Sequence, residues 1–175
     1  MDYQYIINSE NRIYVNGELI LTNQQVVDAI NFANNALDAL DKQTKEFDIN
    51  IFEAMGMRNL SGIVGEYLGK SIQRFSNGAL HSNLHQDGYP DLLLINSPER
   101  KQYFESLYTI KEGKKYPRDK SLFSPYRYGG IEVKATCGST PPARNIPKPL
   151  IGEQRIHLVN SFDWKAHHRE TDRKS

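Results

Sequence analysis

Two short apolar segments within residues 12–21 are separated by Asn16-Gly17. An Asn-Gly pair between such segments favours a tight β-hairpin, because both positions tolerate a positive φ. Thr22 follows as a good helix N-cap, and Gln25 three residues later completes a capping box. The pattern therefore predicts a hairpin that leads directly into a helix.

The apolar spacing then becomes helical over two long segments. In the first, apolar residues form one stripe, made of Val26, Ile30, Ala33, Leu37 and Leu40. The second predicted helix covers about residues 60–75, and its three glycines, at positions 62, 65 and 69, leave one face nearly bare of side chains. Each glycine destabilises a helix by about 1 kcal/mol relative to alanine. This face therefore predicts a place where the backbone approaches another group closely.

Shorter elements are predicted in the second half of the chain. The Leu-Leu-Leu-Ile run at residues 92–95 predicts a strand buried on both faces. Ser97-Pro98 predicts the start of a helix that extends to about residue 110. The remaining predictions are a polar loop at 81–88, a basic polar segment at 111–127, a strand at 131–136, a proline-rich loop at 137–149 and a strand at 155–160.

The chain has 175 residues, which is enough for one domain with a small appendage. Its single cysteine excludes a disulfide framework and a Cys-rich zinc module. No stretch approaches the roughly 18 apolar residues of a membrane span, so we expect no membrane partner. The first residues lack the basic and apolar regions of a signal peptide, which predicts a cytoplasmic location.

Charge is distributed unevenly along the chain. Residues 1–110 hold 8 lysines and arginines against 14 acidic residues, whereas residues 111–175 hold 14 against 7. A basic C-terminal third is a weak indication of a polyanionic partner. The alternative is a solvated basic surface that the acidic part of the fold neutralises.

The candidate chemistry lies in three carboxylates and one lysine. Asp91 begins the buried strand, and Glu132 and Lys134 alternate along the second strand, so that both project from the same face. Glu66 lies among the helix glycines. If these groups converge, they suit metal-assisted hydrolysis of a phosphodiester, because Mg²⁺ prefers oxygen ligands and retains several waters. Taken singly, Asp91 is better explained as a strand cap, and Glu132 and Lys134 as a surface pair. For Glu66, an exposed helix residue and a site residue are equally good explanations.

Pro90-Asp91, followed by Glu132-Val133-Lys134 on an adjacent strand, resembles the PD-(D/E)xK motif of the nuclease superfamily that includes type II restriction endonucleases. The surroundings of the motif resemble that family too. A buried apolar run follows the aspartate, a Gly-Gly-Ile leads into the Glu-x-Lys segment, and a helix that carries a glutamate precedes both.

The resemblance covers about residues 59–160 and implies an α/β fold, with a small mixed β-sheet flanked by helices as in the restriction-endonuclease core. It implies a nuclease-like core at 59–175 that is preceded by an N-terminal hairpin and helical extension at 1–58. The chain ends soon after Val159, whereas the family's core continues with a helix and a further strand. This ending is consistent with a C-terminally truncated core or with a naturally abbreviated one.

In this family the strand aspartate, the glutamate of Glu-x-Lys and the carbonyl between Glu and Lys bind magnesium. By matching position, the resemblance implies Asp91, Glu132 and the Val133 carbonyl as Mg²⁺ ligands. It implies that Lys134 serves the attacking water and that Glu66 assists the site. The implied activity is Mg²⁺-dependent cleavage of double-stranded DNA, carried out by a homodimer in which two sites meet two strands.

Basic residues on either side of the second strand are candidates for DNA contacts. Arg127 precedes the strand, and the proline-rich loop after it carries Arg144, Asn145 and Lys148. A nuclease must hold phosphates with lysine and arginine, and a loop stiffened by prolines loses less entropy when it orders against DNA. A solvated basic loop is equally consistent with the sequence.

Other functions remain open at this stage. One is a catalytically inactive or truncated nuclease fold that binds DNA or another partner without cutting. Another is an interaction domain in which the motif is accidental. His81 and His85, with Asp87, would suit zinc if they lay on a helix, but the neighbouring glycines and Pro90 favour a loop.

Overall fold

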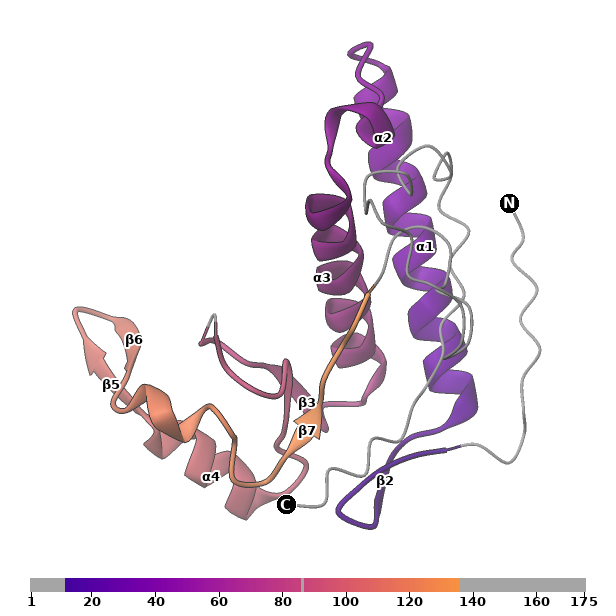
Figure 1. Ribbon diagram of the computed structural model, residues 1–175. Coiled ribbons are helices and arrows are strands. Elements are labelled where there is room, and N and C mark those ends of the chain that lie inside the picture. Colours follow the sequence, from indigo (N-terminus) through magenta and orange to yellow (C-terminus); the bar gives the residue numbers. More distant parts are fainter. Residues whose placement is uncertain (1–11, 86, 136–175) are drawn as a thin grey trace, which may run out of the picture.

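The computed structural model describes residues 12–85 and 87–135, and Figure 1 shows two long helices beside a small sheet. The predicted loop at 137–149 and the predicted strand at 155–160 lie outside the described residues. In chain order the elements are β1 (Ile13–Val15), β2 (Glu18–Leu21), α1 (Asn23–Lys45), α2 (Ile51–Ala54), α3 (Met57–Phe75), β3 (Leu80–Ser82), β4 (Leu92–Leu94), α4 (Pro98–Ser106), β5 (Tyr108–Lys111), β6 (Lys114–Pro117), the 3₁₀ helix η1 (Lys120–Leu122) and β7 (Gly130–Ile131).

The predicted N-terminal hairpin and the helix after it are confirmed. β1 and β2 pair antiparallel around Asn16 and Gly17, which have φ values of 52° and 80°. The Thr22 hydroxyl accepts a hydrogen bond from the Gln25 backbone N–H, and the Gln25 side chain accepts one from the Thr22 backbone N–H. The same Gln25 side chain donates to the Phe75 carbonyl at 2.7 Å, which joins the start of α1 to the end of α3.

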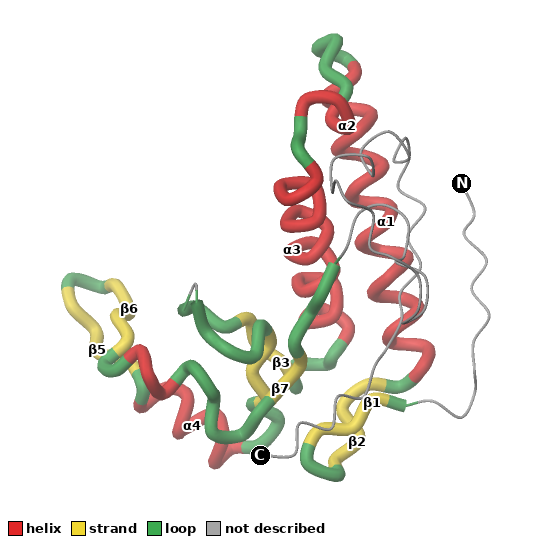
Figure 2. Tube along the Cα trace, viewed as in Figure 1, coloured by secondary structure: helices red, strands yellow, loops and turns green. Residues whose placement is uncertain are grey.

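α1 and α3 lie side by side, with α2 near their far end (Figure 2). Between the three helices is a buried apolar group, here called the helix cluster, made of Leu37, Ile51, Phe52, Leu60 and Val64. This cluster joins residues on both sides of position 58, so the N-terminal segment and the following residues share a core. The bare face of α3 is not part of this packing, because a Cβ built at Gly62 or Gly69 would meet no described atom within 4 Å.

β4 is the central strand of the main sheet and pairs antiparallel with β3 on one side and β7 on the other. Its three leucines are all buried, as the sequence predicts. Leu92 and Leu94 contribute to the leucine cluster, which also holds Ile20, Leu21 and Leu80. Leu93 contributes to the aromatic cluster, which also holds Ile95, Phe104, Leu107, Tyr108, Phe123 and Tyr126. The strand that follows Asp91 is therefore packed on both faces.

β7 approaches β4 so closely that its first residue has to be glycine. A Cβ at Gly130 would overlap the carbonyl oxygen of Leu92. In the ladder Gly130 pairs with Leu93, and Ile131 pairs with Leu92. The chain that leaves β7 consequently runs beside the start of β4.

The segment after α4 differs from the prediction. The helix ends at Ser106 rather than near residue 110, and Tyr108–Lys111 forms strand β5, which pairs with β6. Glu112 and Gly113, with φ values of 51° and 74°, make the turn between them. Tyr108 is buried against Phe123 in the aromatic cluster, a long-range contact that helical periodicity could not indicate.

The α/β class, with small sheets flanked by helices, is confirmed. All strand pairs in the described part of the chain are antiparallel, whereas the resemblance predicted a mixed sheet. β7 covers Gly130–Ile131 only, because residues 132–135 leave the ladder, and β3 occupies the start of the segment predicted as a polar loop. None of the helices within residues 12–85 and 87–135 has the length and apolar character needed to cross a membrane.

Candidate active site

Asp91 and Glu132 are adjacent because they flank paired strands. Asp91 immediately precedes β4 and Glu132 immediately follows β7, and the antiparallel register continues from the pair Leu92–Ile131. The Asp91 backbone N–H donates to Glu132 Oε2 at 3.2 Å, and the Val133 backbone N–H donates to Asp91 Oδ2 at 2.7 Å. Two of the predicted catalytic carboxylates are therefore brought together by reciprocal hydrogen bonds.

Lys134 joins this group through Glu132. Its Nζ donates to Glu132 Oε1, so the two side chains project from the same side of the segment, as their spacing predicts. The Lys134 side chain is 81% exposed, whereas that of Glu132 is 22% exposed. The hydrogen bond to Glu132 raises the pKa of Lys134 above its usual value, so the ammonium group stays protonated at neutral pH.

Asp91 lies in an environment that disfavours its ionised form. Burial is the main cause that raises the pKa of this carboxyl group, and the charge of Glu132 raises it further. The Val133 N–H and the charge of Lys134 act in the opposite direction but do not offset these effects. A cation beside the two carboxylates would favour the ionised form of Asp91 and so oppose the effect of burial.

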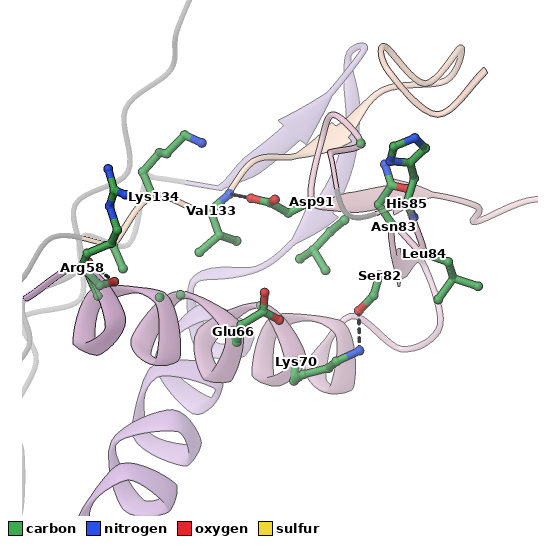
Figure 3. A pocket seen from close by; sticks show the side chains of 17 residues that line it. Arg58, Glu66, Lys70, Ser82, Asn83, Leu84, His85, Asp91, Val133 and Lys134 are labelled. Atoms are coloured by element: carbon green, nitrogen blue, oxygen red, sulfur yellow. Dashed lines mark hydrogen bonds between the residues drawn. The ribbon is translucent and has the colours of Figure 1, made fainter. Parts of the chain in front are cut away.

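A cavity of about 470 Å³ opens beside these residues. Its walls are the bare face of α3, the segment from Ser82 to His85, and residues 133–135. Figure 3 shows Glu66 pointing from α3 toward Asp91 and Val133, and all three line the cavity. A volume of this size is within the range of ligand pockets, and it contains three of the four predicted catalytic residues, namely Glu66, Asp91 and Lys134.

The glycines of α3 have a clear structural use. Gly62, Gly65 and Gly69 all line the cavity. Only Gly65 has a described atom near a Cβ position, the Cβ of Ala135 at 3.7 Å. The bare helix face therefore keeps the cavity open and lets the segment after Lys134 lie close to α3.

Several cavity residues were not predicted from the sequence. Lys70 donates from Nζ to Ser82 Oγ at 2.8 Å, and Figure 3 shows the two side chains meeting at the end of α3. Arg58 lines the other end of the same helix face. Arg58, Glu66 and Lys70 are spaced by multiples of four, so the helical period that revealed the glycines also contained the signal for both cations.

Asn83 is a further residue that the sequence did not reveal. Its backbone N–H donates to the Asp91 carbonyl at 2.7 Å, and its side-chain amide donates to the Pro90 and Phe123 carbonyls at 3.1 and 3.0 Å. A Cβ at Gly88 would overlap the Asn83 amide. Asn83 therefore fixes the main chain on which Asp91 is placed, and no local pattern in the sequence indicates such long-range bonds.

The other predicted contacts have mixed outcomes. Arg127 does not line the cavity; its guanidinium carbon lies 5.7 and 5.4 Å from the ring centroids of Tyr103 and Tyr128. The remaining predicted DNA contacts, Arg144, Asn145 and Lys148, lie outside the described residues. His85 lines the cavity and its Nδ1 accepts from the Asp87 N–H at 2.9 Å.

The ligand atoms near Asp91 suit a partly hydrated Mg²⁺ ion. Within residues 12–85 and 87–135, no three His, Cys, Asp or Glu side chains are close enough to hold a metal by themselves. Asp91 and Glu132 supply carboxylate oxygens, and Val133 supplies a carbonyl in the same segment. Mg²⁺ is commonly bound by one or two carboxylates and keeps several waters, so these residues fit Mg²⁺ better than they fit a metal enclosed by protein ligands.

Comparison of the chain with protein-family models, with curated proteins and with solved structures found no match.

Proposed function

We propose that this chain is a metal-dependent endonuclease that hydrolyses phosphodiester bonds of double-stranded DNA, similar to type II restriction enzymes. The observation that supports this most strongly is the reciprocal hydrogen bonding between Asp91 and the Glu132–Val133 segment at the edge of a cavity. The residues of the resemblance are far apart in the sequence, so their convergence is not a consequence of local spacing.

Mg²⁺ is the cofactor of this proposal, with Asp91, Glu132 and the Val133 carbonyl as its ligands. When bound, the ion supplies charge stabilisation to the phosphate and makes a bound water more acidic. The grouping of two carboxylates, Asp91 and Glu132, with the single ammonium group of Lys134 supports a cation at this place.

The chain's own cations and Glu66 have separate roles in the proposal. Lys134 holds its proton at Nζ, because Glu132 raises its pKa, so it donates a hydrogen bond to the attacking water or to a phosphate oxygen rather than removing a proton. Glu66 orients water from the opposite wall of the cavity. Arg58 and Lys70, 12 residues and so about 18 Å apart along α3, hold phosphates on either side of the cleaved bond.

The proposal extends to properties beyond the cavity. Arg127, Arg144, Asn145 and Lys148 remain proposed DNA contacts, a homodimer would place one site on each strand, and the DNA would be met in the cytoplasm. These points follow from the resemblance and from the positive charge of the C-terminal third. Each can be wrong while the proposed chemistry of the cavity is right.

Cleavage of a supercoiled plasmid tests the proposal. The wild-type chain, an Asp91→Asn variant and an Asp48→Asn control are incubated with plasmid in Mg²⁺, in Ca²⁺ and in EDTA. Asp48 is exposed and distant from the cavity, and its φ of 57° is one that asparagine tolerates. We expect cleavage in Mg²⁺ by the wild type and the control only. Equal cleavage by the Asp91 variant would assign the activity to something other than this site, and DNA bound but uncut by the wild type would refute the proposal.

A second candidate, DNA binding without cleavage, is favoured by one observation. Both carboxylate oxygens of Glu132 accept hydrogen bonds from the protein, one from Lys134 and one from the Asp91 N–H. Such a group is satisfied without a metal. Binding that is independent of divalent ions, with no cleavage in Mg²⁺ or Mn²⁺, would support this second candidate.

A further inference from the structure

The β5–β6 hairpin extends from the body beyond α4, away from α1 and α3 (Figures 1 and 2). Its base is firmly held. Tyr108 is buried with its ring centroid 5.2 Å from that of Phe104 and 5.4 Å from that of Phe123. Arg118 closes the other strand, because its N–H donates to the Leu107 carbonyl at 2.8 Å and its Nε donates to the Tyr108 carbonyl at 3.1 Å. The hairpin is thus a projecting element on a rigid base.

The outer half of the hairpin concentrates positive charge. Residues 108–117 contain three lysines and one glutamate. Lys111 lies directly opposite Lys114 in the ladder, and like charges in such a position destabilise a strand pair. None of the ion pairs found within the described ranges uses a hairpin lysine. Among the described residues, no acidic side chain therefore compensates the charges of Lys111 and Lys114. An external anion would compensate them.

Apolar and aromatic groups are exposed beside these lysines. Ile110 is 71% exposed and Tyr116 is 46% exposed. Tyr116 pairs with Thr109 in the ladder, and Ile110 pairs with Lys115, so each of the two side chains has a basic or polar neighbour across the strands. A surface that is only solvated does not require exposed apolar groups among its charges.

We propose that the β5–β6 hairpin is a DNA-binding element that enters the major groove of a duplex. The major groove is wide enough for a two-stranded β-ribbon. Lys111 and Lys114 would contact phosphates at the groove edges, and Tyr116, which lies on the same face of the hairpin, would pack against the groove lining. The choice of DNA as the anion rests on the proposed function, whereas the charge and shape of the hairpin are independent of it.

The hairpin is coupled to the candidate active site through one strand. Tyr108 at the hairpin base and Leu93 of β4 belong to the same aromatic cluster, and β4 begins immediately after Asp91. A duplex held by the hairpin is therefore held at a fixed position relative to the carboxylates, without a flexible connection between them.

Duplex binding at a series of salt concentrations tests the proposal. The Lys111→Gln/Lys114→Gln variant is compared with the wild type and with Lys42→Gln/Lys45→Gln, which removes the same charge from the far end of α1. Binding of a labelled 20-bp duplex is measured in Ca²⁺. If two phosphate contacts are lost, the slope of log K against log salt should fall by about 1.8, and affinity should fall about tenfold or more at low salt. The control should bind like the wild type.

The outcomes separate this inference from the nuclease proposal. Unchanged binding by the hairpin variant would overturn the hairpin's role, even if the wild type cuts DNA. Loss of binding by that variant, with no cleavage by the wild type, would support the hairpin and refute the nuclease. Two further results would overturn insertion into the DNA groove. One is a wild-type affinity for polyglutamate equal to that for the DNA duplex. The other is tighter binding of the wild type to duplex RNA than to duplex DNA, because the major groove of RNA is too narrow for side chains to read. Circular dichroism of the variant checks its fold.

Discussion

The backbone N–H of Val133 holds Asp91 Oδ2 at 2.7 Å. The peptide between Glu132 and Lys134 therefore orients the aspartate that lies 42 residues earlier. This arrangement depends on the main chain, so it requires only that the segment after β7 stays beside the start of β4.

Asp91→Asn and Glu132→Gln should each remove DNA cleavage. Each change takes away a proposed metal ligand. The amide oxygen at position 91 can still accept from the Val133 N–H, whereas the single amide oxygen at position 132 can keep only one of the two hydrogen bonds that Glu132 accepts. Circular dichroism of both variants checks that the fold is retained. The expected loss is on the order of 10³-fold or more. Single-turnover cleavage in saturating Mg²⁺ measures it, and duplex binding in Ca²⁺ should remain. Wild-type cleavage rates in either variant would remove that residue from the site.

Lys134→Ala should also abolish cleavage while DNA binding persists. The expected loss is roughly 10²–10³-fold, the range for removal of one donor that stabilises developing charge. Lys134→Arg should restore little, because the guanidinium group differs in shape and position. The measurement is the single-turnover rate of both variants beside the wild type. A Lys134→Ala rate within about threefold of wild type would contradict the role.

Glu66→Gln should have a smaller effect on cleavage than the changes at Asp91 and Glu132. Glu66 lines the cavity from α3, and its proposed contact is with water rather than with the metal. A loss of about 10- to 100-fold is expected for such an outer group. Glu53→Gln on α2, away from the cavity, serves as the control for removal of one glutamate. Full activity of the Glu66 variant would indicate that Glu66 is an exposed helix residue with no role in cleavage.

Gly130→Ala and Gly62→Ala should change stability in opposite directions. A methyl group at 130 overlaps the Leu92 carbonyl oxygen, so β4 and β7 must separate, and unfolding should become easier by about 1–3 kcal/mol. A methyl group at 62 meets no described atom within 4 Å and should stabilise α3 by about 1 kcal/mol. Urea unfolding measures both free energies. Equal shifts of the same sign would contradict the geometry.

Glu18 and Arg100 should give the fold an acid-sensitive contribution. Hydrogen bonds from Arg100 and Asn96 lower the pKa of Glu18 from 4.5 to about 2, because the ionised carboxylate is the form they favour. The contribution is therefore complete above pH 4.5 and is lost as the pH falls toward 2. Thermal unfolding between pH 2 and 6 should show a weaker acid dependence for Glu18→Gln than for the wild type. Glu105→Gln, exposed on α4, should behave like the wild type.

Local signals in the sequence predicted much of the fold. The capping box at Thr22 and the apolar run at 92–95 each fix an element within a few residues, and both were confirmed. The β5–β6 hairpin was missed because Tyr108 directly follows a helix and is held by Phe123, which is distant in sequence. β7 was predicted too long, because apolar and polar residues alternate over 132–135 as they do in a strand. In the structure this segment forms no ladder, and it is joined to Asp91 by hydrogen bonds that involve side chains.

The candidate site was predictable only in part for a similar reason. Asp91, Glu132 and Lys134 carry recognisable spacing, and Glu66 lies among glycines on one helix. The roles of Lys70 and Asn83 depend on bonds to Ser82 and to the Pro90 and Phe123 carbonyls. Such bonds form only when the loop before β4 folds back on the sheet, and residue type alone does not indicate them.

The double packing of β4 has a consequence for how the site responds to partial opening of the protein. The backbone N–H group of Ile95 donates to the carbonyl of Ala79, on the side of β4 that faces away from β7. This amide should be among the last to exchange with deuterium. β7 has only two residues, so the peptide that carries Glu132 should exchange much sooner. Asp91 thus adjoins the strand that we expect to be most protected, whereas Glu132 follows a segment that we expect to open locally while the rest of the protein stays folded.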